Sequence, residues 1–203
     1  MASKGEMVKV PASFWNCRRA AYHGRLQILQ LLVSKGRPLE AEVTHFAAAG
    51  GHLDILQWAI KNGCPWSEVA SICAAREGHL NVLKWAHENG APWDETSYTV
   101  AAENGHLHIL MYLFENNCPY DETLCSNAAK NGHLEIIHWA YSKGIPWDKW
   151  TCFEAARNGH LDVLKWVRRY GCPWDNLTSY GAFEGNHQEI IHWIRENNCP
   201  SNE

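Results

Sequence analysis

Two kinds of segment with helical patterns of apolar residues alternate in this chain, and both recur along its length. In one segment the apolar positions are Leu107, Ile109, Leu110, Tyr112 and Leu113. This spacing fits a period of 3.6 residues and predicts an amphipathic helix. A preceding segment carries the pair Ala101 and Ala102, which favours a second helix by propensity. No segment alternates with period 2, so the pattern predicts helix pairs and no strands.

Residues that start and stop helices flank each predicted helix. Asp94 is suited to cap the first helix of its unit, and Gly105 is suited to end that helix in the left-handed conformation. The equivalent cap positions are Ser13, Glu40, Ser67, Asp94, Asp121, Asp148 and Asp175, of which only Glu40 is a poor cap. The second helix closes at Gly36, Gly63, Gly90, Asn117, Gly144, Gly171 and Asn198. Only Gly and Asn occur there, the residues that adopt positive φ at low cost.

The prolines show that the helix pairs form one regular array. They stand at Pro11, Pro38, Pro65, Pro92, Pro119, Pro146, Pro173 and Pro200, each 27 residues after the last. We therefore expect a leader at 1–10, one repeat domain of seven units at 11–199 with boundaries near 11, 38, 65, 92, 119, 146 and 173, and a stub at 200–203. A pair of short helices cannot bury its apolar faces alone, so the pairs should stack into an all-α solenoid.

Composition and charge exclude several classes of protein. The 203 residues are 46% hydrophobic and 20% charged, with a net charge of −4 and no run of lysine or arginine. The basic surface typical of proteins that bind nucleic acid or anionic lipid is therefore missing. No apolar stretch approaches the roughly 20 residues that cross a bilayer, and the start lacks a secretory signal. Eight cysteines without a CxxC motif indicate free thiols in a reducing compartment, so we expect a cytoplasmic protein.

Histidines and tryptophans also recur at fixed positions. The histidines are His52, His79, His106, His133, His160 and His187. Equivalent positions in neighbouring units should lie about 9 Å apart, too far to share a metal ion, so we expect each ring to hydrogen-bond within its own helix turn. The recurrent tryptophans should pack between successive units. Neither a nucleophile elbow nor a phosphate-binding loop occurs, so we expect no enzyme activity, no cofactor and no metal site.

The segments AAENGHLHIL, AAKNGHLEII and AARNGHLDVL resemble the ankyrin repeat, whose units share an alanine pair, a Gly-His turn and an aliphatic second helix. Ankyrin units have about 33 residues. The six residues missing here fall where the family carries its β-hairpin, so we expect a solenoid with shortened loops. The family's TPLH segment is also replaced, for example by TSYT at 96–99. The short unit with its CPWDE segment is similar to arrays found in giant viruses and some protists, which often follow an F-box. Only ten residues precede the first repeat in this sequence, so we expect no F-box in it.

The resemblance implies a protein-binding module without enzymatic activity, in which the first helices line a concave face. The family's variable AAxxG positions, which contact partners, correspond here to Tyr22, Arg76, Glu103, Lys130, Arg157 and Glu184. A helical wheel adds Trp150, because nine of the 21 positions on the outward stripe of the first helices are apolar or aromatic. Alternatively, several of these residues pack against a neighbouring first helix.

Three functions fit these observations. The first is a scaffold or adaptor that binds one partner protein as a monomer. The resemblance implies a viral origin for it, and then a place in the host cytoplasm. The second is a substrate-recognition adaptor for a ubiquitin ligase, suggested by relatives that carry an F-box. The third is a structural component that assembles end to end. None of the three requires nucleic acid or a membrane.

Overall fold

The computed structural model describes residues 15–67 and 69–201, and this part of the chain contains 14 helices and no strand. The expected leader 1–10, the cap position Ser13 and residues 202–203 lie outside the described residues. The first helices of the pairs are α1 (Cys17–Tyr22), α3 (Glu42–Ala49), α5 (Ala70–Arg76), α7 (Glu95–Glu103), α9 (Leu124–Lys130), α11 (Lys149–Arg157) and α13 (Asn176–Glu184). The second helices are α2 (Leu26–Ser34), α4 (Leu53–Lys61), α6 (Leu80–Glu88), α8 (Leu107–Glu115), α10 (Leu134–Ser142), α12 (Leu161–Arg169) and α14 (Gln188–Glu196).

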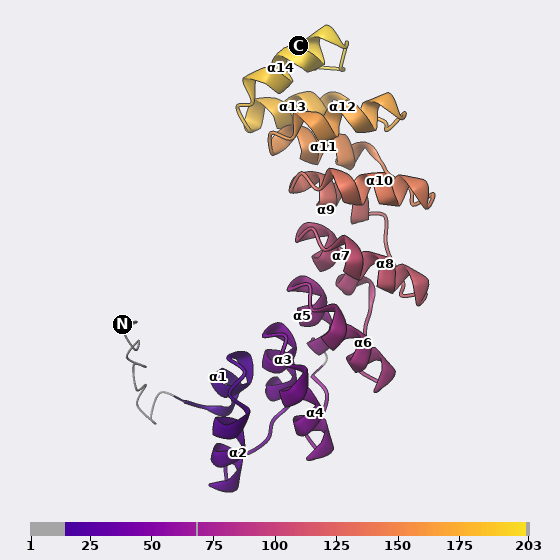
Figure 1. Ribbon diagram of the computed structural model, residues 1–203. Helices are drawn as coiled ribbons and strands as arrows, with labels where there is room; N and C mark the ends of the chain where they lie inside the picture. The colour runs from indigo at the N-terminus through magenta and orange to yellow at the C-terminus, as the bar shows by residue number, and fades with distance from the viewer. Residues whose placement is uncertain (1–14, 68, 202–203) are drawn as a thin grey trace, which may run out of the picture.

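The helix pairs stack side by side into a curved solenoid. Figure 1 shows an arc with the odd-numbered helices along its inner side and the even-numbered helices along its outer side. Each inner helix contacts the inner helix of the next pair more extensively than each outer helix contacts the next outer helix. This closer packing on one side produces the curvature. We refer below to the odd-numbered helices as the inner helices and to the even-numbered ones as the outer helices.

One apolar core runs along the array between the two layers. The alanine pairs of the inner helices, such as Ala101 and Ala102, are fully buried, as are Ile109, Leu110 and Leu113 of α8. Alanine has the smallest apolar side chain with a Cβ, so the backbones of neighbouring inner helices can approach closely. The larger Leu and Ile side chains of the outer helices fill the space beneath them.

The predicted caps act directly in three of the inner helices, whereas α3, α5 and α9 begin after Ala41, Val69 and Thr123 without a side-chain cap bond. Asp94, Asp148 and Asp175 cap α7, α11 and α13, each accepting a hydrogen bond from a backbone N–H two residues on. The first inner helix is instead capped by Asn16, whose Oδ1 accepts from Arg19 N at 2.8 Å. All seven predicted stop positions of the outer helices, including Asn117 and Asn198, have positive φ.

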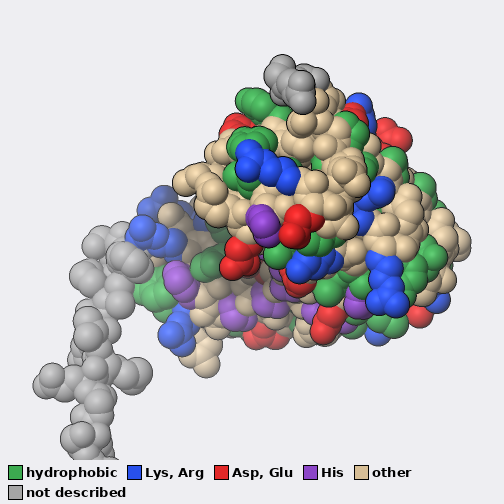
Figure 2. All heavy atoms as spheres, turned by 90° about the horizontal axis from the view of Figure 1, so that it is seen from above, with side chains coloured by type: hydrophobic (Ala, Val, Ile, Leu, Met, Phe, Trp, Pro, Cys, Tyr) green, Lys and Arg blue, Asp and Glu red, His purple; other side chains and the backbone are tan. Residues whose placement is uncertain are grey.

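The recurrent histidines join successive pairs, so the expectation that each ring bonds within its own turn is wrong. His160 Nε2 lies 3.1 Å from the carbonyl oxygen of Lys130, 30 residues earlier, in the preceding pair. A carbonyl oxygen only accepts, so Nε2 carries the hydrogen. The same bond recurs at His52, His79, His106, His133 and His187, with distances of 2.8–3.2 Å. Figure 2 shows histidine side chains gathered along one side of the array.

The glycine before each histidine serves both this contact and the turn. Gly132 has φ +73°, and a Cβ built there would lie 2.6 Å from Nδ1 of His160. Gly24, Gly51, Gly78, Gly105 and Gly159 meet the histidine of the following pair in the same way. Asn186, which replaces glycine in the last pair, also has positive φ, and its side chain accepts a hydrogen bond from Gln188. The glycine is therefore required where a histidine ring packs onto it.

The tryptophans belong to the scaffold, but their contacts differ in part from the expected ones. Trp66 and Trp85 pack with ring centroids 5.9 Å apart within one repeat, as do Trp147 and Trp166. The contacts between repeats are made by other rings that stack on the next tryptophan. His87 stacks on Trp93 at 3.6 Å, and Tyr141 stacks on Trp147 at 5.0 Å. An aromatic side chain near the end of one outer helix thus packs against the start of the next repeat.

Candidate functional site

Six of the seven residues predicted to bind a partner share one position in the fold. Each is the last residue of an inner helix, and together with Ala49 they form the terminal row: Tyr22, Ala49, Arg76, Glu103, Lys130, Arg157 and Glu184. Five of the six predicted members are exposed, and Glu103 is half-buried. The row therefore presents variable side chains from successive repeats along one edge of the inner helices.

The histidines hold the backbone of the terminal row in place. The carbonyl groups of Tyr22, Arg76 and Glu103 accept the bonds from His52, His106 and His133. Ala49, Lys130 and Arg157 accept the equivalent bonds from the following pairs. A side chain whose backbone is fixed loses less freedom when a partner binds, which favours binding. The recurrent scaffold residues thus position the variable ones.

Two ion pairs within the terminal row were missed by the sequence analysis. Lys130 Nζ lies 3.8 Å from a carboxylate oxygen of Glu103, and Arg157 Nε lies 3.1 Å from one of Glu184. The signal was present, because opposite charges stand 27 residues apart at the same position of neighbouring repeats. Arg76 forms no ion pair with any described residue. Exposed pairs of this kind contribute little to stability, about 0–1 kcal/mol.

Trp150, the seventh predicted residue, lies apart from the terminal row, in the first turn of α11. It is 45% exposed, and its ring meets Phe153 edge to face at a centroid distance of 5.4 Å. It borders a groove of about 330 Å³ between α9 and α11, lined also by Glu122, Thr123, Ser126, Asn127, Asp148 and Glu154. An exposed tryptophan beside polar groups is typical of residues that anchor protein interfaces.

Part of the predicted outward stripe is not accessible. Cys73 and Val100, at its middle position, are 4% and 5% exposed. Each inner helix between the two ends of the array packs against an inner helix on both sides. More of its surface is therefore covered than a helical wheel with one buried face predicts. For these two residues the alternative expectation, packing against a neighbouring first helix, is the correct one. Residues at the two ends of each inner helix remain accessible.

An aromatic cluster at the amino-terminal end of the inner face was also missed. His45 stacks on Phe46 with a centroid distance of 4.6 Å, and Phe46 meets Tyr22 edge to face at 6.5 Å. Burial lowers the pKa of His45, and the nearby Arg76 guanidinium lowers it further. The ring is therefore neutral at neutral pH and can stack as an apolar group. Its sequence signal was weak, because histidine occurs at that position in no other repeat.

The cysteines are free and mostly buried. Cys64, Cys118, Cys172 and Cys199 each donate a hydrogen bond to a carbonyl oxygen 24 residues earlier, at 3.2–3.6 Å. Burial raises the pKa of Cys64 to about 11 and those of Cys118 and Cys125 to about 12. Thiols of this kind are protonated at neutral pH and react slowly. Within residues 15–67 and 69–201, no group of three His, Cys, Asp or Glu side chains could hold a metal ion.

We expect thiol labelling to separate the cysteines into two classes. Six are buried, whereas Cys17 and Cys199 are half-buried. At pH 8, at most two thiols of the folded protein should therefore react quickly with Ellman's reagent. All eight thiols should react after denaturation. Fast reaction of three or more thiols in the folded protein would contradict the buried positions.

No described helix is long and apolar enough to cross a membrane. Lys, Arg, Asp and Glu side chains are interspersed on the face seen in Figure 2, without a large area of one sign.

Comparisons with known proteins agree with this architecture. A family model described as ankyrin repeats (3 copies) matches residues 71–151. Among solved structures, the crystal structure of the human ASB11 ankyrin repeat domain matches with a TM-score of 0.65. The match has 19% sequence identity and covers 78% of this chain and 85% of that chain, so it shows the fold alone. No curated protein matches the sequence.

Proposed function

We propose that this chain, whose residues 71–151 match the model of ankyrin repeats and whose fold is that of an ankyrin repeat domain, is an adaptor whose partner protein binds the inner face. Ankyrin repeats generally serve as protein–protein interaction modules. In this proposal the partner contacts Trp150 and the terminal row, above all Tyr22, Arg76 and the two ion pairs. The whole of 11–199 acts as one binding domain, monomeric and cytoplasmic.

The observation that carries this proposal is the contrast between fixed and variable positions on the inner helices. The alanine pairs that recur along these helices are fully buried. The residues that differ between repeats stand at the helix ends, where side chains such as Tyr22 and Trp150 are 45% exposed. Exposed aromatic and arginine side chains on a rigid support are the residue types that contribute most to protein interfaces.

The experiment compares two variants of equal net charge. The inner-face variant carries Trp150→Ala together with Arg157→Glu and Glu184→Arg, which inverts one ion pair instead of leaving like charges together. The control carries Met111→Ala with Lys61→Glu and Glu88→Lys on the outer helices, where Met111 is 43% exposed. The two variants and the unmodified chain are each used as bait to capture partners from lysate of the native cell. The affinity of each for the purified partner is then measured by calorimetry.

We expect the inner-face variant to bind the partner at least tenfold more weakly, as loss of an interface anchor worth about 2 kcal/mol implies. The control should bind within twofold of the unmodified chain. Circular dichroism and thermal unfolding establish that all three fold alike. Equal binding by the inner-face variant and the unmodified chain would refute the proposed face.

A further inference from the structure

Helix α12 carries a cluster of positive charge that no other outer helix has. Lys165, Arg168 and Arg169 stand at positions that hold, in the repeat before, His138, Tyr141 and Ser142. In the last repeat the same positions hold His192, Arg195 and Glu196. No other repeat holds a cation at all three positions, so the repeat fold does not require the complete cluster.

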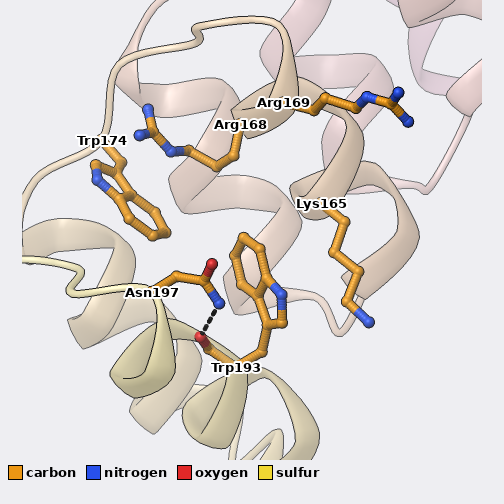
Figure 3. A pocket seen from close by; sticks show the side chains of 6 residues that line it. All are labelled: Lys165, Arg168, Arg169, Trp174, Trp193 and Asn197. Carbon is orange, nitrogen blue, oxygen red and sulfur yellow. Dashed lines mark hydrogen bonds between the residues drawn. The ribbon is translucent and has the colours of Figure 1, made fainter.

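The cluster lies at a pocket of about 280 Å³ between α12 and α14, lined by Lys165, Arg168, Arg169, Trp174, Trp193 and Asn197. Figure 3 shows the rings of Trp174 and Trp193 with Asn197 between them. Arg168 extends toward Trp174, whereas Lys165 and Arg169 project away from that ring, so their charges stand at the rim of the pocket. The lining therefore combines three cations, two indole rings and one amide, without a carboxylate.

Arg168 is held in this pocket by the scaffold. Its guanidinium lies over the ring of Trp174, 4.2 Å from the ring centroid. His87 and Tyr141 occupy the equivalent position in earlier repeats, and each stacks on the tryptophan of the repeat that follows it. Its Nη1 donates to the carbonyl of Cys172. Its Nε is buried and has no hydrogen-bond partner. A guanidinium held in a fixed position by the scaffold is suited to an anionic ligand.

The two rim cations have no acidic partner among the described residues. Neither Lys165 nor Arg169 forms an ion pair there. Glu196, at the end of the facing helix α14, pairs instead with His192 at 3.1 Å. In a chain of net charge −4, an uncompensated group of three cations is a local exception. Such a group attracts an acidic ligand.

We propose that this pocket is a second binding site, separate from the inner face, that takes an acidic side chain of a protein partner. Lys165 and Arg169 pair with the ligand carboxylate from the rim, and Arg168 adds its positive charge. The two indole rings pack against the aliphatic part of the ligand. The site lies on the outer helices, so its partner residue is not one that contacts the terminal row.

The surroundings favour a protein ligand over a membrane or a nucleic acid. Trp174 and Trp193 are half-buried and form pocket walls, whereas insertion into a bilayer requires apolar side chains that protrude. All three cations of the cluster stand on one helix, and Ser142 and Glu196 occupy the position of Arg169 in the two neighbouring repeats. A nucleic-acid backbone would need a basic track that continues across repeats.

The test uses an acetylated, amidated hexaglutamate peptide as the probe and hexaglutamine as its neutral counterpart. Binding to the full chain is followed by two-dimensional NMR on the indole N–H signals of Trp174 and Trp193. One variant carries Lys165→Gln and Arg169→Gln, and keeps Arg168 because of its structural contacts. The matched control carries Lys84→Gln and Lys61→Gln, the same two positions in other repeats, and so loses the same charge outside the pocket.

We expect hexaglutamate to shift both indole signals with saturation, and hexaglutamine to leave them unchanged. The pocket variant should bind at least tenfold more weakly, the control within twofold, and added salt should weaken binding by the unmodified chain. Absence of saturable shifts, or equal losses in both variants, overturns the proposal. Binding only to phosphatidylserine vesicles or to a single-stranded oligonucleotide, and not to the peptide, also overturns it. The inner-face variant should bind the peptide normally, so this site and the proposed function fail separately.

Discussion

Replacing Gly132 with alanine is expected to lower the free energy of unfolding by about 3 kcal/mol. About 1–2 kcal/mol comes from forcing a residue with a Cβ into positive φ, which is +73° here. A similar amount comes from the new Cβ, which would lie 2.6 Å from His160 Nδ1 and displace the ring from the carbonyl of Lys130. Urea unfolding followed by circular dichroism measures the change.

Gly144 provides a matched control because it has nearly the same backbone conformation without the contact. Its φ is +71°, and nothing lies within 4 Å of a Cβ built there. Gly144→Ala should therefore cost only the conformational part, about 1–2 kcal/mol. The difference between the two substitutions isolates the contact between repeats.

A double substitution tests the cause of that difference. In Gly132→Ala with His160→Ala, the ring that the new methyl group meets is gone, so the combined cost should be smaller than the sum of the two single costs. Additive costs would show that the histidine does not set the requirement for glycine. Equal costs for Gly132→Ala and Gly144→Ala would lead to the same conclusion.

Replacing Leu110 with alanine should also be strongly destabilising, by about 3 kcal/mol. Leu110 is fully buried in α8, near the middle of the array. Truncation of a buried leucine typically costs about 2–5 kcal/mol through lost burial and the cavity that remains. In a solenoid each repeat is stabilised only by its neighbours, so a weak central repeat separates the array into two halves. We expect the single unfolding transition to broaden or to divide into two.

Leu29 allows the same substitution to be made at one end of the array. It occupies the equivalent position of α2 and is also fully buried. Leu29→Ala should expose the amides of α1 and α2 to hydrogen exchange, while protection of the helices from α5 onward remains within a factor of a few of the unmodified protein. Leu110→Ala should lower protection on both sides of α8. Identical exchange patterns in the two variants would contradict the view that each repeat is stabilised only by its immediate neighbours.

The sequence by itself determined the helices, their ends and their period. Positive φ at Gly105 and Asn117 and capping by Asp94 follow from contacts within a few residues. Such contacts depend on backbone conformation and helical spacing, which a single segment specifies. The resemblance to ankyrin repeats and the all-α solenoid followed from the same local signals.

Only the tertiary structure decided which residues meet across repeats. His160 bonds to Lys130 instead of its own turn, Arg157 pairs with Glu184, and Val100 is covered by neighbouring helices. Contacts between residues 24–30 positions apart depend on how each repeat is translated and rotated against the next. That relation is set by the packing of small side chains between the inner helices, and the period of 27 residues does not specify it. The same packing places Arg168 over Trp174 and so forms the pocket between α12 and α14.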